Sequence, residues 1–445
     1  MRFQVAGIRL LVCCLLSAGA VLPLAAEEPT AGEGLYRIDL PTALRLARAD
    51  NLDVKLAEER INEARAEYGS AVARFLPWLT AGVAFRRHEG RTQAVDGTLV
   101  DVDKQSTTFG PTITAQVDVG DAMFMSLAAK QTIHATQAAL LARQQDSALA
   151  AATGYFELLK ARAVVETNRD ALAASRDYEQ QLQGGVDAGV IFKGDLLRVQ
   201  TQTQRYQAAV IQAQQQQRLA AARLADVLHL DPAIELVPRE DDLVPIALVR
   251  EQSAQDLLFD QALQARPELQ QSQAQLQAAR EAGRNTVYGP LIPSVGMQAF
   301  FGELGGGPGS AGGNFGHSRD YMVGLSWRLG PGGLFDFSRV KGARSKVASA
   351  ELAVEKVSST IRRQVVEAQA RVQGSADQMA ASRQALDSAQ ETLRLTRERK
   401  QLGVGIVLED IQAQQELVRA RTEYLGAITS FNEAQYELSK ALGTL

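Results

Sequence analysis

Few residues of this sequence have the types and spacing that catalysis or metal binding requires. The four histidines, His88, His134, His229 and His317, do not stand at ligand spacings from one another, and no serine or cysteine lies in a nucleophile motif. His88 and His317 flank polar segments, where solvated side chains are expected. The pattern favours a protein that is not an enzyme and that holds no cofactor or metal.

Three further features have simple explanations. Met123 and Met125 could bind copper through their thioethers, but methionines commonly fill irregular gaps, so packing is the favoured interpretation. The segment 303–319, ELGGGPGSAGGNFGHSR, lacks the Gly-Lys-Ser/Thr ending of a phosphate-binding loop and is expected to be a flexible loop. A net charge of −4 without any basic block gives no indication of a nucleic-acid partner.

The most informative residues lie in a stretch that occurs twice. DAGVIFKGDLLRVQ (187–200) corresponds to QLGVGIVLEDIQAQ (401–414), and Gly189-Val190 matches Gly403-Val404 at an offset of 403 − 189 = 214 residues. A glycine at such a point permits positive φ and the close approach of another backbone. The charged residues beside the two glycines are Asp187, Asp195, Arg397, Glu398, Lys400, Glu409 and Asp410.

The N-terminus has the composition of a secretory signal peptide. Arg2 and Arg9 precede the apolar run LLVCCLLSAGAVLPLAA, and polar residues follow it. We expect residues 1–26 to be this signal, with an uncleaved membrane anchor and lipidation at Cys13 as alternatives. Cys13 and Cys14 are the only cysteines, so the processed chain is expected to contain neither disulfides nor thiolate metal sites.

The repeated stretch belongs to a duplication of the whole processed chain. ARFLPWLTAGVAF (73–85) resembles GPLIPSVGMQAFF (289–301), with an offset of 216 between their prolines. Internal similarity at a fixed offset indicates two copies of one structural unit. The predicted organisation is a first repeat over 27–229, a proline-containing connector over 230–254 and a second repeat over 255–445.

Each repeat contains two long helical segments. Apolar residues recur every seventh position at Ala151, Leu158, Val165 and Leu172, and the series continues in the second repeat at Val365, Val372, Met379, Leu386 and Leu393. Sevenfold spacing with small residues between is typical of supercoiled helices. Helices are therefore predicted over 123–187, 194–229, 337–401 and 407–443.

Four shorter segments alternate between apolar and polar residues. This period predicts strands over 78–88, 107–119, 294–302 and 320–329, each near the 9–11 residues that a tilted strand needs to cross a bilayer. The inserts 89–106 and 303–319 are predicted to be outer loops. The residues expected to face lipid are Leu79, Val83, Phe85, Tyr321, Val323, Leu325 and Trp327.

A sheet of four strands raises a problem in a membrane. Its unpaired edges would leave N–H and C=O groups in hydrocarbon, and two hairpins are too few to close a barrel. The strands are therefore expected to share one barrel with other copies of the chain, with eight strands in a dimer or twelve in a trimer.

These features together resemble the TolC-like outer-membrane efflux proteins. The resemblance rests on the duplication, two strands per repeat, the Leu-Pro and Ile-Pro entries into strands, the two Gly-containing tips and the ending YELSKALGTL (436–445). It implies an α+β membrane protein: a homotrimer with a shared 12-stranded transmembrane β-barrel and a periplasmic α-barrel of coiled-coil helices. It implies a location in the outer membrane, in contact with its lipid, extending into the periplasm.

The resemblance also implies a function. Such a protein is the passive exit duct of a tripartite efflux pump, working with a periplasmic adaptor (membrane fusion) protein and an inner-membrane transporter of the RND or ABC type. Gly189-Val190 and Gly403-Val404 would then dock the adaptor, and the charged residues beside them would be possible constriction charges. We favour small-molecule efflux. The alternatives are type I protein secretion and, in another class, a structural periplasmic or surface coiled-coil protein.

Overall fold

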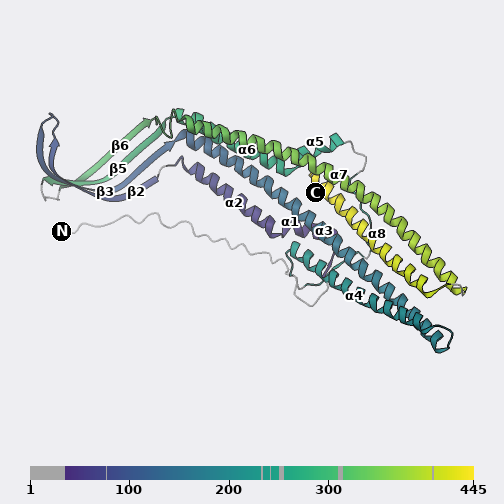
Figure 1. Cartoon of the computed structure of the whole chain (residues 1–445). Helices are drawn as coiled ribbons and strands as arrows, with labels where there is room; N and C mark the ends of the chain where they lie inside the picture. Colours follow the sequence, from purple (N-terminus) through teal and green to yellow (C-terminus); the bar gives the residue numbers. More distant parts are fainter. Residues whose placement is uncertain are drawn as a thin grey trace, which may run out of the picture.

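The protein is long and narrow, with a β-sheet at one end and helices that run away from it (Figure 1). The computed structural model describes residues 36–76, 78–231, 234–240, 242–249, 255–308, 314–402 and 405–445. The predicted signal peptide and the pair Gly403-Val404 lie outside these ranges. The longest helix has 69 residues, which at 1.5 Å per residue gives it a length of about 100 Å.

Each half of the chain contributes the same series of elements. The first half contains α1 (Leu40–Ala49), α2 (Leu52–Ala73), β2 (Trp78–Gln93), β3 (Leu99–Asp118), α3 (Val119–Asp187) and α4 (Lys193–Val227). The second half contains α5 (Gln255–Ala265), α6 (Pro267–Tyr288), β5 (Ser294–Pro308), β6 (Asn314–Ser326), α7 (Phe337–Gln401) and α8 (Val407–Ala441). Helices α4 and α8 both have 35 residues and are offset by 407 − 193 = 214 positions. The internal duplication and the predicted combination of long helices with strands are confirmed.

The long helices pack along the heptad stripes that the sequence predicts. Every member of the two series is buried except Met379, which is partly buried between two apolar clusters. Helix α3 pairs with α4 and α7 with α8, while the shorter α2 and α6 cover the parts of α3 and α7 nearest the sheet. Alanines at many contact positions let the helix backbones approach closely, which explains the low aromatic content.

The helices begin where the sequence supplies capping groups. The Asp39 carboxylate accepts a hydrogen bond from the Thr42 N–H at 2.9 Å, and Pro41 occupies the first turn of α1. Asn51 caps α2 in the same way, through the N–H of Asp53. Pro267 begins α6, where its missing N–H has no intrahelical partner to lose.

The sheet is antiparallel in the order β2-β3-β5-β6. Directly opposite residues share a face, so the register decides which side chains lie together. Leu79 pairs with Ile113, Ile113 with Ala299, and Ala299 with Tyr321. The register therefore brings the apolar residues of all four strands to one face, as the alternation predicts.

The opposite face holds the polar residues of the strands, with Phe300, Leu304 and Met322 among them, and is hollow. A cavity of about 560 Å³ lies on it, and most of its lining comes from the polar-face positions of the strands. Its lining includes Thr80, Thr112, Gln298, Ser318 and Asp320. The sheet thus curves around its polar face and leaves its apolar face convex.

The strands are longer than predicted on the side away from the helices. The segments 89–106 and 303–319 are largely strand, because the backbone ladder continues beyond the apolar residues. A turn over 94–98 closes the first hairpin, where the Asp96 carboxylate accepts from the Thr98 N–H. Opposite charges such as Arg91 and Asp101, 3.7 Å apart, support the extension. At its other end β6 stops at Ser326, so Trp327 lies beyond the strand, where its indole donates to the Leu291 carbonyl.

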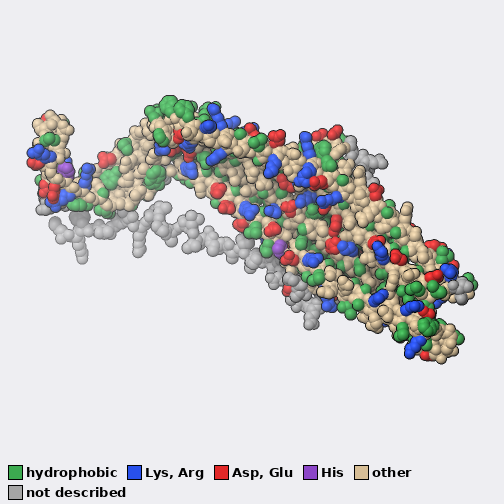
Figure 2. Space-filling model, viewed as in Figure 1, with side chains coloured by type: hydrophobic (Ala, Val, Ile, Leu, Met, Phe, Trp, Pro, Cys, Tyr) green, Lys and Arg blue, Asp and Glu red, His purple; other side chains and the backbone are tan. Residues whose placement is uncertain are grey.

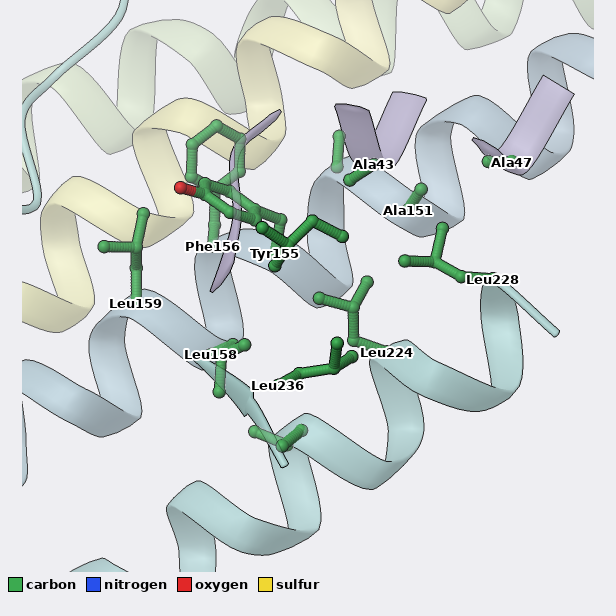
Figure 3. Packing of buried hydrophobic residues seen from close by; sticks show 14 of the residues in the cluster. Ala43, Ala47, Ala151, Tyr155, Phe156, Leu158, Leu159, Leu224, Leu228 and Leu236 are labelled. Carbon is green, nitrogen blue, oxygen red and sulfur yellow. The ribbon is translucent and has the colours of Figure 1, made fainter. Parts of the chain in front are cut away.

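The main apolar core lies midway along the molecule. Two short parallel strands, β1 (Tyr36–Ile38) and β4 (Leu236–Pro238), pair there beside α1, α3 and α4. Figure 3 shows Tyr155, Phe156 and Leu158 of α3 against Leu224 of α4 and Leu236 of β4. The residues of the predicted connector that join the two repeats therefore form part of the core.

Charged side chains are spread over the helical part and gather again at the far tip of the sheet, whereas the middle of the sheet shows few (Figure 2). No helix in the described part of the chain is long and apolar enough to cross a bilayer.

Candidate functional site at the hairpin tips

The first tip is a tight turn between α3 and α4. Gly189 follows the helix end with φ +72°, the left-handed conformation that closes many helices. The N–H groups of Val190 and Ile191 both donate to the Gly185 carbonyl, at 2.9 and 3.2 Å. A Cβ on Gly185 would come within 2.3 Å of the Ile191 Cδ1 atom, so a side chain there would force Ile191 to move, whereas Gly189 is needed for its φ.

Both tips expose apolar side chains. Val190 is 79% exposed and Phe192 is 73% exposed at the first tip. At the second tip Leu402 is 79% exposed and Ile406 is 59% exposed, on either side of residues 403–404. Large exposed apolar side chains at an extremity are typical of a surface that contacts another protein.

Five of the seven charged residues near the tips have partners within their own hairpin, and the Arg397 guanidinium is one of them, donating to the Gln414 side chain at 3.2 Å. Asp187 accepts a hydrogen bond from the Gln183 amide at 2.7 Å, and Asp195 forms an ion pair with Arg198 at 2.9 Å. Glu398 pairs with Arg394, and Glu409 pairs with Arg399 at 3.3 Å. Exposed pairs of this kind contribute little to stability, about 0–1 kcal/mol each.

Three of the charged residues meet in a pocket between the two hairpins. Arg397, Lys400 and Asp410 line a cavity of about 460 Å³ together with Tyr178 of α3 and Tyr206 of α4. The Lys400 ammonium lies 3.3 Å from the centroid of the Tyr178 ring. This is a cation–π contact that joins the end of α7 to α3.

The pocket contains polar groups without partners. Within the described residues, Asp410 Oδ1 and the hydroxyls of Tyr178 and Tyr206 are buried and accept or donate no hydrogen bond. Burial and the nearby Asp410 and Asp195 carboxylates raise the pKa of Tyr178 to about 12. Burial lowers the pKa of Lys400, against the opposing effect of Asp410. The pocket therefore places charged and hydroxyl groups between helices that elsewhere pack mainly through apolar side chains.

Sequence reasoning did not identify the two tyrosines. A difference between the repeats could have indicated the pocket. Asp410 is equivalent to Leu196 of the first repeat at the 214-residue offset, and Lys400 is equivalent to Val186. Leu196 packs in an apolar cluster with Tyr178, Leu182 and Val199. The second repeat therefore presents charges where the first presents apolar side chains.

His88, His317, Met123 and Met125 lie in or beside the sheet, away from the tips. His88 and His317 lie in β2 and β6 rather than in loops, and His317 Nδ1 is 2.7 Å from the Glu303 carboxylate. Met123 and Met125 lie in the first turns of α3, beside the sheet. No group of three potential metal ligands is found among the described residues.

The comparisons with known proteins agree with this architecture. The model of the family described as outer membrane efflux protein matches residues 43–228 and 258–444, which is most of both halves. The chain belongs to the outer membrane efflux protein family. Membership confirms the predicted family and location: the chain is an outer-membrane exit duct, for efflux or type I secretion, that extends into the periplasm.

Individual relatives are distant. CyaE of Bordetella pertussis is 27% identical over 68% of this chain, and the match spans 63% of CyaE, less than two thirds of its length. The outer membrane efflux protein BepC of Brucella suis is 21% identical over 76% of this chain and 74% of its own. The outer-membrane channel CmeC of Campylobacter jejuni superposes with a TM-score of 0.75 at 15% identity, over 91% of this chain and 85% of CmeC, which shows a shared fold.

Proposed function

We propose that three copies of this chain form the exit duct of a tripartite pump that expels small molecules. The observation that carries the proposal is the open sheet. Among the described strands of one chain, none lies beside the outer edges of β2 and β6, and the convex face is apolar. Edges of this kind are stable in hydrocarbon only when other strands pair with them. Three copies supply twelve strands and leave a lumen lined by the polar faces.

The duct has partners at its helical end. The exposed tips carry Gly189-Val190 and Gly403-Val404, which dock a periplasmic adaptor, and the adaptor joins the duct to an inner-membrane transporter of the RND or ABC type. The apolar side chains beside these pairs, Val190, Phe192, Leu402 and Ile406, support this role. Conduction itself is passive and requires no chemistry from the chain.

The number of copies is measured directly by mass photometry of the detergent-solubilised protein. We expect a single species of three chains. The membrane face is measured in the same preparation with Leu325→Arg and its neighbour Ser326→Arg. Leu325 lies on the apolar face and Ser326 on the polar face, and an arginine facing lipid near the midplane costs about 2–4 kcal/mol.

Leu325→Arg should therefore reduce the amount of trimer strongly, and Ser326→Arg should leave it nearly unchanged. A stable folded monomer, or equal losses in both variants, would refute the shared barrel. Small-molecule efflux is tested in cells that lack the gene: dye accumulation should rise and should fall again on complementation. Loss of one exported protein with unchanged dye accumulation would instead indicate type I secretion.

A further inference from the structure

The structure contains a template for the contact between copies. In one chain, the seam between β3 and β5 joins the last strand of the first hairpin to the first strand of the second. In a closed ring, β6 would meet β2 of the next copy, which is again a last strand against a first strand. Because the hairpins are repeats of one unit, the seam inside the chain predicts the register between chains. This inference rests on the proposed assembly.

The equivalent positions follow from the observed pairings. Strands β2 and β5 begin at Trp78 and Ser294, so the offset between them is 294 − 78 = 216. Trp78 pairs with Thr114, and Ser294 pairs with Ser326, so the offset between β3 and β6 is 326 − 114 = 212. The side chains agree, since Phe109 corresponds to Tyr321 and Ile113 to Leu325.

Transfer of the seam gives one register. Inside the chain, Thr108 pairs with Leu304. Adding 212 to the first number gives Asp320, and subtracting 216 from the second gives His88. We propose that β6 pairs with β2 of the next copy so that Asp320 lies opposite His88 and Arg319 opposite Glu89. The same register places Leu325 opposite Val83 and Val323 opposite Phe85, which continues the apolar face across the joint.

The polar groups at the two edges fit this pairing. Within the described residues, Asp320 and Arg319 have no ion-pair partner, and Nε2 of His88 is buried without a hydrogen bond. Glu89 has Arg87 of its own strand as its ion-pair partner. Pairing of β6 with β2 of the next copy thus places the Asp320 carboxylate beside the His88 imidazole on the polar face. It places the Glu89 carboxylate beside Arg319 on the outer face.

Neighbouring registers are less favourable. A slip by one residue would turn the apolar side chains of one copy to the polar face of the next. A slip by two residues places Arg319 opposite either Arg87 or Arg91, and like charges directly opposite are destabilising. The slip toward Arg87 also brings Asp320 opposite Arg86, so this register is the main competitor.

One local difference from the template is expected. Where Gly110 and Gly302 cross in the internal seam, a Cβ on Gly110 would come within 2.3 Å of the Phe301 carbonyl oxygen, and the ladder is interrupted between Phe109 and Thr112. The equivalent residues at the joint are Met322 and Arg86, which have side chains. The joint therefore continues as a regular ladder through this point, with no change of register, because the internal register is the same on both sides of the interruption.

The test uses cysteine pairs, since the only native cysteines lie in the predicted signal peptide. Directly opposite residues in an antiparallel ladder have Cα atoms about 4.5–5.5 Å apart, within the range for a disulfide. His88→Cys with Asp320→Cys should cross-link the copies on mild oxidation and give covalent trimers on a non-reducing gel. The pairs Arg86→Cys with Asp320→Cys and Gly90→Cys with Asp320→Cys, each two residues away, should cross-link several-fold less.

The matched control is the equivalent pair inside one chain, Thr108→Cys with Leu304→Cys. It should lose its free thiols without any increase in mass. More efficient cross-linking of either shifted pair would overturn the register while leaving the trimer intact. So would a trimer in which none of the three pairs between copies cross-links although the internal control does. A monomer by mass photometry would instead refute the proposed function itself.

Charge exchange gives an independent measurement on the outer face. Arg319→Glu and Glu89→Arg should each lower the temperature at which the trimer dissociates on a gel. The double variant should recover most of that decrease, because the opposite charges face each other again. A double variant that dissociates no later than the weaker single variant would overturn the pairing of Arg319 with Glu89.

Discussion

Helices α4 and α8 occupy the same place in the two repeats, yet they bury different side chains. The buried residues of α4 are mainly Leu, Val and Ala. Helix α8 buries Asp410, Asn432 and Gln435. At the 214-residue offset, the equivalent residues of α4 are Leu196, Arg218 and Ala221. The difference reflects the surroundings, because α8 packs against both α7 and α3 and also holds the connector between the repeats.

The connector is held through its backbone. Asn432 accepts a hydrogen bond from the Ile246 N–H at 2.7 Å and donates to the Val244 carbonyl at 2.9 Å. Gln435 accepts from the N–H groups of Leu248 and Val249, both at 3.1 Å. The extended segment 242–249 pairs with none of the described strands and thus receives hydrogen bonds from a helix. The two repeats thus share one backbone arrangement. Polar residues that occur only in the second repeat let α8 bind the connector.

The largest effect is expected from Asn432→Leu. The change replaces a fully buried amide and leaves the half-buried Ile246 N–H and the Val244 carbonyl without partners, at a cost of about 1–3 kcal/mol in the free energy of unfolding. Denaturant unfolding followed by circular dichroism measures it, and limited proteolysis should show faster cleavage near 242–249.

The control lies at the equivalent position of the other helix. Arg218 is exposed on α4, so Arg218→Leu should change stability by no more than about 0.5 kcal/mol. If the two leucine variants unfold at the same denaturant concentration, the connector is not held by α8.

Much of the fold can be predicted from the sequence because it depends on short periods. The heptad series around Leu158 and Val365 indicates the helices, and alternation in residues such as Val323 and Leu325 indicates the strands and their faces. Both patterns arise because one face of the helix or strand lies against apolar surroundings and therefore carries apolar residues at a regular spacing. The strand ends carry no such signal: beyond Phe85 the ladder continues through polar residues, so the predicted loops 89–106 and 303–319 were wrong.

The candidate site was less predictable for a different reason. The sequence identifies Gly189 and the charges near it, but a charge run does not reveal which members turn inward. Arg397, Lys400 and Asp410 meet Tyr178 only because two hairpins far apart in the sequence lie side by side. The roles of the tip residues in docking and of the charges in a constriction stay predictions.

The charged residues of the pocket can be replaced by the apolar residues that the first hairpin has at the equivalent positions. Lys400→Val alone leaves the buried Asp410 carboxylate without its nearby cation, and we expect a loss of about 1–2 kcal/mol, below the range for fully buried pairs because Lys400 is partly exposed. The double variant Lys400→Val with Asp410→Leu, which copies Val186 and Leu196, should regain that loss. Denaturant unfolding of the two single variants and the double variant completes the cycle. Additive losses would show that the two charges do not interact.

The first tip separates turn strain from docking. Gly189 has φ +72° and nothing within 4 Å of a built Cβ, so only its backbone conformation opposes a side chain. Gly189→Arg should cost about 1 kcal/mol of stability and abolish export, whereas Gly189→Asn, which tolerates this conformation, should fold normally. Gly403 is the equivalent residue of the second repeat. If it also docks the adaptor, Gly403→Arg should likewise abolish export.

Export, trimer abundance and outer-membrane location are measured together for these tip variants. Thr98→Arg, in the turn at the opposite end of the molecule, is the control and should be tolerated. If Gly189→Arg and Gly403→Arg both assemble and export normally, the tips are turns without a docking role.

The smallest effect concerns Glu433 of α8, at the position where α4 has Leu219. Burial, reinforced by the Glu157 and Glu437 carboxylates and opposed by Lys160, raises the pKa of Glu433 from 4.5 to about 7. Between these values the folded chain retains a proton that the unfolded chain has released, so stability is lost as the pH rises through this window.

Glu433→Gln, which stays neutral, should therefore be more stable than the native chain at pH 8 by roughly 1 kcal/mol after allowance for solvent screening, and the difference should shrink toward zero at pH 5. Unfolding midpoints at the two pH values measure this, with Leu219→Gln on α4 as a control whose effect should not depend on pH. A constant difference between Glu433→Gln and the native chain at both pH values would show that Glu433 is ionised throughout and that α8 tolerates a buried charge there.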